Sequence, residues 1–215
     1  MVDVDLDLRP ERRTELAGAI ASALRTAVPG SDVALRGSLA TGKADPFSDI
    51  DLLWAVPVPH VVTAVEAVAG AMSTVAPVAS IRSDPDLEGS TTRRLLFIRL
   101  TGVPLFWRVD LEVQASLPDE SQETPPTPMA APEWSKPASA LANAVAAVKA
   151  VLRGQLLEAR GLLERGFERI GAPYDPHDGW TPSVRRLSQA VADADPALAD
   201  LAAEVEALAL ALLPH

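Results

Sequence analysis

The chain has 215 residues, a net charge of -10 at pH 7 and no cysteine. Its hydrophobic content of 48% supplies enough apolar surface for one large domain or two small ones. The lack of cysteine excludes a disulfide framework, a thiolate metal site and a cysteine nucleophile, and the negative charge opposes binding to a nucleic-acid backbone.

The N-terminal part predicts a helix followed by a strand. Residues 1–7 are acidic and lack the basic and apolar segments of a signal peptide, so we expect a cytoplasmic protein. Apolar side chains recur at helical spacing over 9–28, and the Pro-Gly-Ser-Asp turn at 29–32 ends this predicted helix. The short apolar run 33–35 then predicts the first strand.

A glycine-containing turn follows this strand, in the sequence Arg-Gly-Ser-Leu-Ala-Thr-Gly at 36–42. Gly37 permits a tight turn and the close approach of a ligand, and backbone N–H groups at the start of a following helix bind phosphate oxygens. Ser38 adds a hydroxyl donor. The segment predicts a phosphate-binding turn.

Two aspartates begin the next predicted strand, 48–56. Asp49 and Asp51 are two positions apart, so their side chains project from the same face of the strand. Mg²⁺ prefers such oxygen ligands and completes its coordination shell with water and substrate phosphates. The pair therefore predicts a site for a metal–nucleotide complex.

A third acid lies in a later strand candidate. After a predicted helix that runs to about residue 75, two apolar runs, 93–100 and 105–114, are separated by a short turn and predict a hairpin. Burying Asp110 in the second run is costly without a cation, so Asp110 is the candidate third metal ligand. Glu112, on the same face, is the reserve candidate.

This arrangement of Gly37-Ser38, a spacer, Asp49-x-Asp51 and a later strand acid resembles the nucleotidyltransferase superfamily that includes DNA polymerase beta and the antibiotic nucleotidyltransferases. The resemblance covers residues 10–114. It implies an α/β (α+β) fold with a mixed sheet, and an NTP co-substrate with ATP as first choice. It also implies two Mg²⁺ ions, or Mn²⁺ in their place, held by the catalytic residues Asp49, Asp51 and Asp110. The nucleotide would then be bound by Gly37, Ser38, Lys43 and Ser48.

Where this chain has Thr41, many small members of the superfamily carry a basic residue that helps to hold the triphosphate. Lys43, two positions later, is the candidate replacement, with a solvated loop lysine as the equal alternative. Asp45 lies outside the matched acidic positions and is expected to be a loop or capping residue.

The C-terminal part predicts a second domain. Six prolines within residues 116–137 predict a linker, which divides the chain into a nucleotidyltransferase domain, 1–115, a linker, 116–137, and a helical domain, 138–215. Helical spacing predicts a bundle with helices over 138–170 (broken near Gly154), 182–192 and 196–213. The apolar tract 201–213 is too short to span a bilayer, so we expect a packing helix and no membrane association.

Residues of this helical part are candidates for contacting substrates. Lys149, in an apolar stretch, is a candidate for reaching the triphosphate, and a snorkelling surface lysine is the alternative. Glu158, Glu164 and Glu168 could bind a cationic acceptor, or form a solvated face with neighbouring arginines. The polar-aromatic segment 174–180 could line an acceptor pocket or form an ordinary interhelical loop.

The sequence thus predicts an enzyme that transfers a nucleoside monophosphate to a hydroxyl of a small, cationic molecule and releases pyrophosphate. The helical part resembles the small-molecule branch of the superfamily, so an aminoglycoside-like or lincosamide-like acceptor is the first expectation. One alternative is a toxin–antitoxin-type enzyme that modifies a protein or RNA. Another is a non-catalytic nucleotide-binding module, against which the intact acids Asp49, Asp51 and Asp110 argue.

Overall fold

The computed structural model describes residues 4–57, 60–116 and 135–214. The chain divides into two compact units, residues 6–132 and residues 133–215 with residues 1–5. Most of the predicted linker lies outside the described residues, so the division at 115 and 138 stays a prediction. No helix in the described part of the chain is long and apolar enough to cross a membrane.

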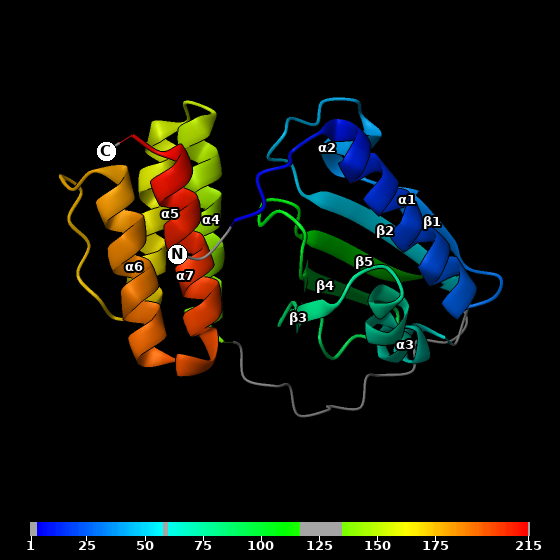
Figure 1. Ribbon diagram of the computed structural model, residues 1–215. Coiled ribbons are helices and arrows are strands. Elements are labelled where there is room, and N and C mark those ends of the chain that lie inside the picture. The colour runs from blue at the N-terminus through cyan, green and yellow to red at the C-terminus, as the bar shows by residue number, and fades with distance from the viewer. Residues whose placement is uncertain (1–3, 58–59, 117–134, 215) are drawn as a thin grey trace. The chain divides into compact units, whose positions relative to one another are not determined.

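The first unit is built on a five-stranded mixed sheet (Figure 1). Its elements are α1 (Pro10–Ala27), β1 (Asp32–Leu35), α2 (Gly37–Ala40), β2 (Ile50–Pro57), α3 (Val61–Ser73), β3 (Val78–Ser83), β4 (Arg93–Leu100) and β5 (Val109–Ser116). The strand order is β1-β2-β5-β4-β3, and only the central pair of β2 and β5 is parallel. The predicted mixed α/β fold is confirmed.

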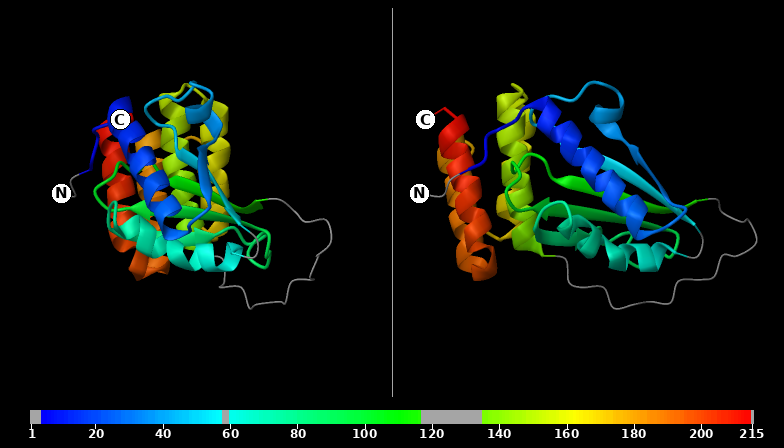
Figure 2. Two further views of the ribbon diagram at one scale, coloured as in Figure 1. Left: turned by 90° about the vertical axis from the view of Figure 1, so that its right-hand side faces the viewer. Right: turned by 45° about the vertical axis from the view of Figure 1, so that its right-hand side comes forward.

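The two long helices cover one face of this sheet (Figure 2). Helix α1 packs against β1, β2 and α3, and α3 packs against β2, β3, β4 and β5. Strand β2 alternates strictly, with Ile50, Leu52 and Trp54 almost fully buried. Leu52 lines a small apolar pocket together with α1 residues, so the apolar face of β2 is the helix-covered face. Asp51 therefore lies on the opposite face.

The predicted strand 105–114 is wrong at its start, because β5 begins only at Val109. The backbone N–H of Trp107 donates to the carbonyl of Pro104 (2.8 Å), which forms a turn in place of extended backbone. Phe106 and Trp107 are nevertheless buried, so their apolar character reflects packing and not a strand. The predicted hairpin is confirmed, since β4 pairs antiparallel with β5.

The second unit is a bundle of helices. It comprises α4 (Lys136–Leu152), α5 (Leu156–Arg169), α6 (Trp180–Ala194), the 3-10 turn η1 (Pro196–Leu198) and α7 (Ala199–Leu212). Helix α4 packs against α5, α6 and α7. Gly154, at a positive φ of 73°, separates α4 from α5, as the sequence predicts. Ser135 caps α4, its hydroxyl accepting from the backbone N–H of Ala138 (3.2 Å).

Candidate active site

The three candidate acids lie where the two central parallel strands begin. Asp51 in β2 is the register partner of Asp110 in β5, and Asp49 directly precedes β2. The backbone N–H of Ile50 donates to the carbonyl of Arg108 (2.9 Å), which continues the pairing just before the ladder. Because side chains two positions apart share a face, all three acids lie on the face opposite the helices.

Gly37 lies against the carboxylate of Asp51. A Cβ atom at Gly37 would be 2.2 Å from Oδ2 of Asp51, and the φ of Gly37 is +57°. Any other residue there would be strained and would displace the acid. The turn is tied to β2 as well, because the N–H of Arg36 donates to the carbonyl of Asp51 (2.8 Å). The predicted phosphate turn and the predicted metal ligand thus adjoin.

Asp110 is paired with an arginine that the sequence analysis did not single out. Arg108 donates from Nε and Nη2 to the two carboxylate oxygens of Asp110, at 2.6 and 2.7 Å. The guanidinium also lies over the ring of Phe97, 4.8 Å from its centroid, and Phe97 is the register partner of Asp110 in β4. This bidentate geometry is the strongest form of arginine–carboxylate pairing.

The charge of Arg108 balances more than one acid. Burial lowers the pKa of Arg108, but the hydrogen bond to Asp110 and the charges of Asp110, Asp49 and Asp51 raise it, and the net direction is upward. Among the described residues no three acidic, histidine or cysteine side chains are grouped closely enough to hold a metal together. The guanidinium thus supplies the positive charge beside these acids.

The arrangement fits a metal on two observations. The donor set consists of hard carboxylate oxygens, and an acid pair opposed across parallel strands is held by backbone pairing. Gly37 leaves space beside Asp51 that a side chain would fill. A metal at Asp110 would compete with Arg108, since both carboxylate oxygens of Asp110 accept hydrogen bonds from it.

Residues 18–88 match the family model described as the nucleotidyltransferase domain. This part of the chain is similar to a nucleotidyltransferase domain. The match includes Gly37, Ser38, Asp49 and Asp51, and ends before Asp110 and before the helical unit. The predicted enzyme class, nucleotidyl transfer, is confirmed at this level.

Solved structures provide three similar proteins. The GLD-2/RNP-8 complex gives 17% identity and a TM-score of 0.39, covering 52% of this chain and 43% of that chain. The polymerase core of TRAMP, an RNA surveillance complex, gives 13% identity and a TM-score of 0.37, and the match covers 91% of this chain and 55% of that chain. A putative nucleotidyltransferase from H. pylori gives 12% identity and a TM-score of 0.28, and the match covers 94% of this chain and 90% of that chain. This chain spans about half the length of the first two, and no curated protein matches it.

The other candidates for binding the nucleotide in this unit, Ser38, Lys43 and Ser48, lie between β1 and β2. Ser38 lies in α2, a single turn of helix, and Lys43 is exposed just after it. The backbone N–H of Lys43 donates to the carbonyl of Ser38 (2.9 Å), which keeps Lys43 beside the turn. Ser48 is buried, and its hydroxyl donates to Asp45 Oδ1 (2.9 Å), so it organises the loop before Asp49.

Lys149 belongs to the helical unit, on α4, and is only 7% exposed. This burial does not favour the alternative of a snorkelling surface lysine. The flanking alanines and Val148, which are buried as well, leave the long lysine stem in an apolar part of the helix. A contact between Lys149 and a triphosphate stays a prediction.

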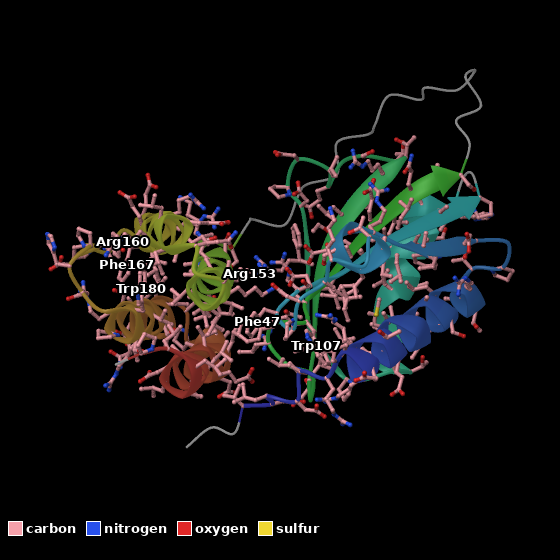
Figure 3. All side chains as sticks on the ribbon, turned by 90° about the horizontal axis from the view of Figure 1, so that it is seen from above. Phe47, Trp107, Arg153, Arg160, Phe167 and Trp180 are labelled. Atoms are coloured by element: carbon pink, nitrogen blue, oxygen red, sulfur yellow. The ribbon has the colours of Figure 1, made fainter. Side chains whose placement is uncertain are left out.

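The polar-aromatic segment 174–180 is explained by packing within the helical unit. Arg160 donates to the carbonyl of Pro176 and lies over the ring of Trp180, 5.1 Å from its centroid. Tyr174 stacks on Phe167 at 5.4 Å. Figure 3 shows Arg160, Phe167 and Trp180 gathered on one side of this unit. These contacts support the alternative of an interhelical loop.

Proposed function

We propose that this protein transfers a nucleoside monophosphate from a metal-bound NTP to a hydroxyl group and releases pyrophosphate. The observation that carries the proposal is the register of Asp51 with Asp110 across β2 and β5, with the backbone of Gly37 against Asp51. This arrangement supports carboxylates and a phosphate-binding turn acting on one substrate.

Asp49, Asp51 and Asp110 would hold two Mg²⁺ ions. When bound, such ions lower the pKa of an attacking hydroxyl and neutralise charge that develops on the leaving phosphate. Gly37 and Ser38 orient the phosphates through their N–H groups and the hydroxyl of Ser38. Lys43, Ser48 and Lys149 are the further candidates for contacting the nucleotide.

Arg108 has two roles in this proposal. Without metal it balances the charge of the acids through its bidentate pair with Asp110. If Asp110 bound a cation, the guanidinium of Arg108 would be free on the side of the sheet that carries the acids. An arginine there suits the negative oxygens of a triphosphate.

A small cationic acceptor, such as an aminoglycoside-like or lincosamide-like compound, is the acceptor that we propose. The net charge of -10 supports a cationic acceptor and opposes a nucleic-acid one. ATP, with transfer of AMP, is the first nucleotide to test.

The test is pyrophosphate release with each of the four NTPs, Mg²⁺ and a pool of aminoglycosides and lincosamides, by wild type and by Asp49→Asn/Asp51→Asn. We expect release with at least one NTP and its loss in the double variant. Release only when cell lysate replaces the pool would point to a protein or other macromolecular acceptor. The proposal would be overturned if no pyrophosphate were released in any assay and the wild type showed no Mn²⁺-dependent NTP binding.

A further inference from the structure

The two segments that lead into the acid-bearing strands are joined to each other. Trp107 precedes Asp110, and its indole Nε1 donates to the carbonyl of Pro46 (3.0 Å), which precedes Asp49. The rings of Phe47 and Phe106 meet edge to face, with centroids 5.1 Å apart and an interplanar angle of 70°. Figure 3 shows Phe47 and Trp107 at the same end of the first unit. One packed cluster therefore supports the approach to both strands.

Arg13 of α1 reaches into the centre of this cluster. Its Nη1 donates to the carbonyl of Asp45 and to that of Ser48, the latter at 3.3 Å. The guanidinium lies over the ring of Trp107, 5.8 Å from the centroid. Arg13 is only 2% exposed, and within the described part of the chain its Nε is buried without a hydrogen-bond partner.

Burying this charge is costly, and it is not needed to fill the space. Burial lowers the pKa of Arg13, while the charge of Asp45 opposes that change. A buried cation that is only partly hydrogen-bonded stabilises a fold less well than an apolar side chain of the same size. Stability alone therefore gives a poor account of an arginine at this position, and its specific hydrogen bonds give a better one.

The two carbonyls that accept hydrogen bonds from Arg13 indicate what this residue positions. The carbonyl of Ser48 belongs to the peptide unit whose nitrogen is that of Asp49, and peptide units are rigid and planar. A hydrogen bond from Arg13 to this oxygen therefore fixes the orientation from which the Asp49 side chain projects. The bond to the carbonyl of Asp45 holds the other end of the same loop.

We propose that Arg13 is a positioning residue for the metal-binding carboxylate of Asp49, acting through the Ser48–Asp49 peptide and braced by Trp107. This inference rests on the proposed function, because it assumes that Asp49 binds metal. Without Arg13 the loop 45–48 would lose its attachment to α1, and Asp49 would no longer be held in a fixed relation to Asp51 and Asp110.

The experiment measures Mn²⁺ binding by isothermal titration calorimetry, without nucleotide, for wild type and two Arg13 variants. Arg13→Met keeps the length and loses the charge and the donors, and Arg13→Lys keeps the charge but not the planar fork. We expect Arg13→Met to weaken Mn²⁺ binding about tenfold, the range found for residues that orient metal ligands. Arg13→Lys should lie between Arg13→Met and wild type.

Val68→Ala is the matched control, because Val68 is fully buried in α3 of the same unit and contributes to the core. It should lower the melting temperature by several degrees and leave Mn²⁺ binding unchanged. Wild-type affinity in either Arg13 variant would overturn the inference, as would an equal loss of affinity in Val68→Ala. No Mn²⁺ binding by the wild type, with or without an NTP, would overturn the proposed function as well, whereas wild-type Mn²⁺ binding that Arg13→Met leaves unchanged would overturn this inference alone.

Discussion

Both carboxylate oxygens of Asp110 accept hydrogen bonds from Arg108, two positions earlier in the chain. The same aspartate is the register partner of Asp51 on the neighbouring strand. A cation that bound Asp110 would therefore compete with an internal guanidinium, and on the proposed function metal affinity would depend on an arginine as well as on the acids.

Arg108→Gln removes this internal competitor. We expect the variant to bind Mn²⁺ about fivefold or more tightly without nucleotide, because charged hydrogen bonds of about 1.5–3 kcal/mol no longer have to be broken. In EDTA its free energy of unfolding should fall, since the acids lose their counter-charge. Calorimetry and urea denaturation measure the two effects.

The control for Arg108→Gln is Arg93→Gln. Arg93 also pairs with an acid of β5, with Nε 2.7 Å from Oε1 of Glu112. This pair lies further along the sheet, so its loss should leave Mn²⁺ affinity at the wild-type value. Equal gains in both variants would show that the effect is one of net charge and not of release from Asp110.

Gly37→Ala tests the contact with Asp51. The added methyl group would collide with the carboxylate, so we expect about a tenfold loss of Mn²⁺ affinity and a loss of stability of about 1–3 kcal/mol. Gly42→Ala is the control, because Gly42 has a similar φ of +67° and nothing within 4 Å of an added Cβ. It should cost about 1 kcal/mol through backbone strain alone and should keep its metal affinity.

Asp110→Asn and Glu112→Gln separate the third ligand from its reserve candidate. Glu112 is paired with Arg93, whereas Asp110 lies opposite Asp51. We expect Asp110→Asn to lower pyrophosphate release about 100-fold or more, and Glu112→Gln to change it by less than about threefold. Equal losses in both variants, measured at saturating metal and NTP, would contradict the assignment of Asp110.

The fold followed from the sequence wherever a local pattern matched the tertiary environment. Strand composition located β2 and an apolar run located β4, and the positive φ at Gly154 occurs where the break between two helices was predicted. The start of β5 was misjudged because Phe106 and Trp107 are as apolar as strand residues. They pack instead against the loop 45–48, a long-range contact that no local pattern encodes.

The sequence predicted the acidic residues of the candidate site, but it did not predict the arginines beside them. Arg108 could have been found, because an arginine two positions before an acid in an extended run lies on the same face. Arg13 could not, since a helix near the N-terminus gives no sign of which distant loop its side chain contacts. The sequence also did not reveal that Val148 and its neighbour Lys149 would both be buried.

Tyr174 provides a prediction for the helical unit. Burial raises the pKa of Tyr174 above its ordinary value of 10.0, although the charge and hydrogen bond of Arg160 oppose this. The folded state thus holds the phenolic proton more tightly than the unfolded state. The stabilisation is complete below pH 10 and is lost as the pH rises through the folded-state pKa.

This titration is directly observable, because Tyr174 is the only tyrosine in the sequence. We expect the absorbance change near 295 nm to have its midpoint above the value measured in concentrated urea. Tyr174→Phe should abolish the signal and flatten the alkaline part of the stability curve. A midpoint equal to that of the unfolded chain would contradict the burial of the ring.

On the proposed function, the parallel pairing of β2 and β5 would make metal binding a late event in folding. The two strands are adjacent in the sheet but far apart in the chain, with α3, β3 and β4 between them. Closing such a long loop is entropically costly, and contacts of this kind form slowly. Asp51 and Asp110 meet only when the sheet is complete, so a refolding chain should acquire its metal affinity last. Mn²⁺ would then distinguish a finished sheet from a collapsed intermediate that already has its helices.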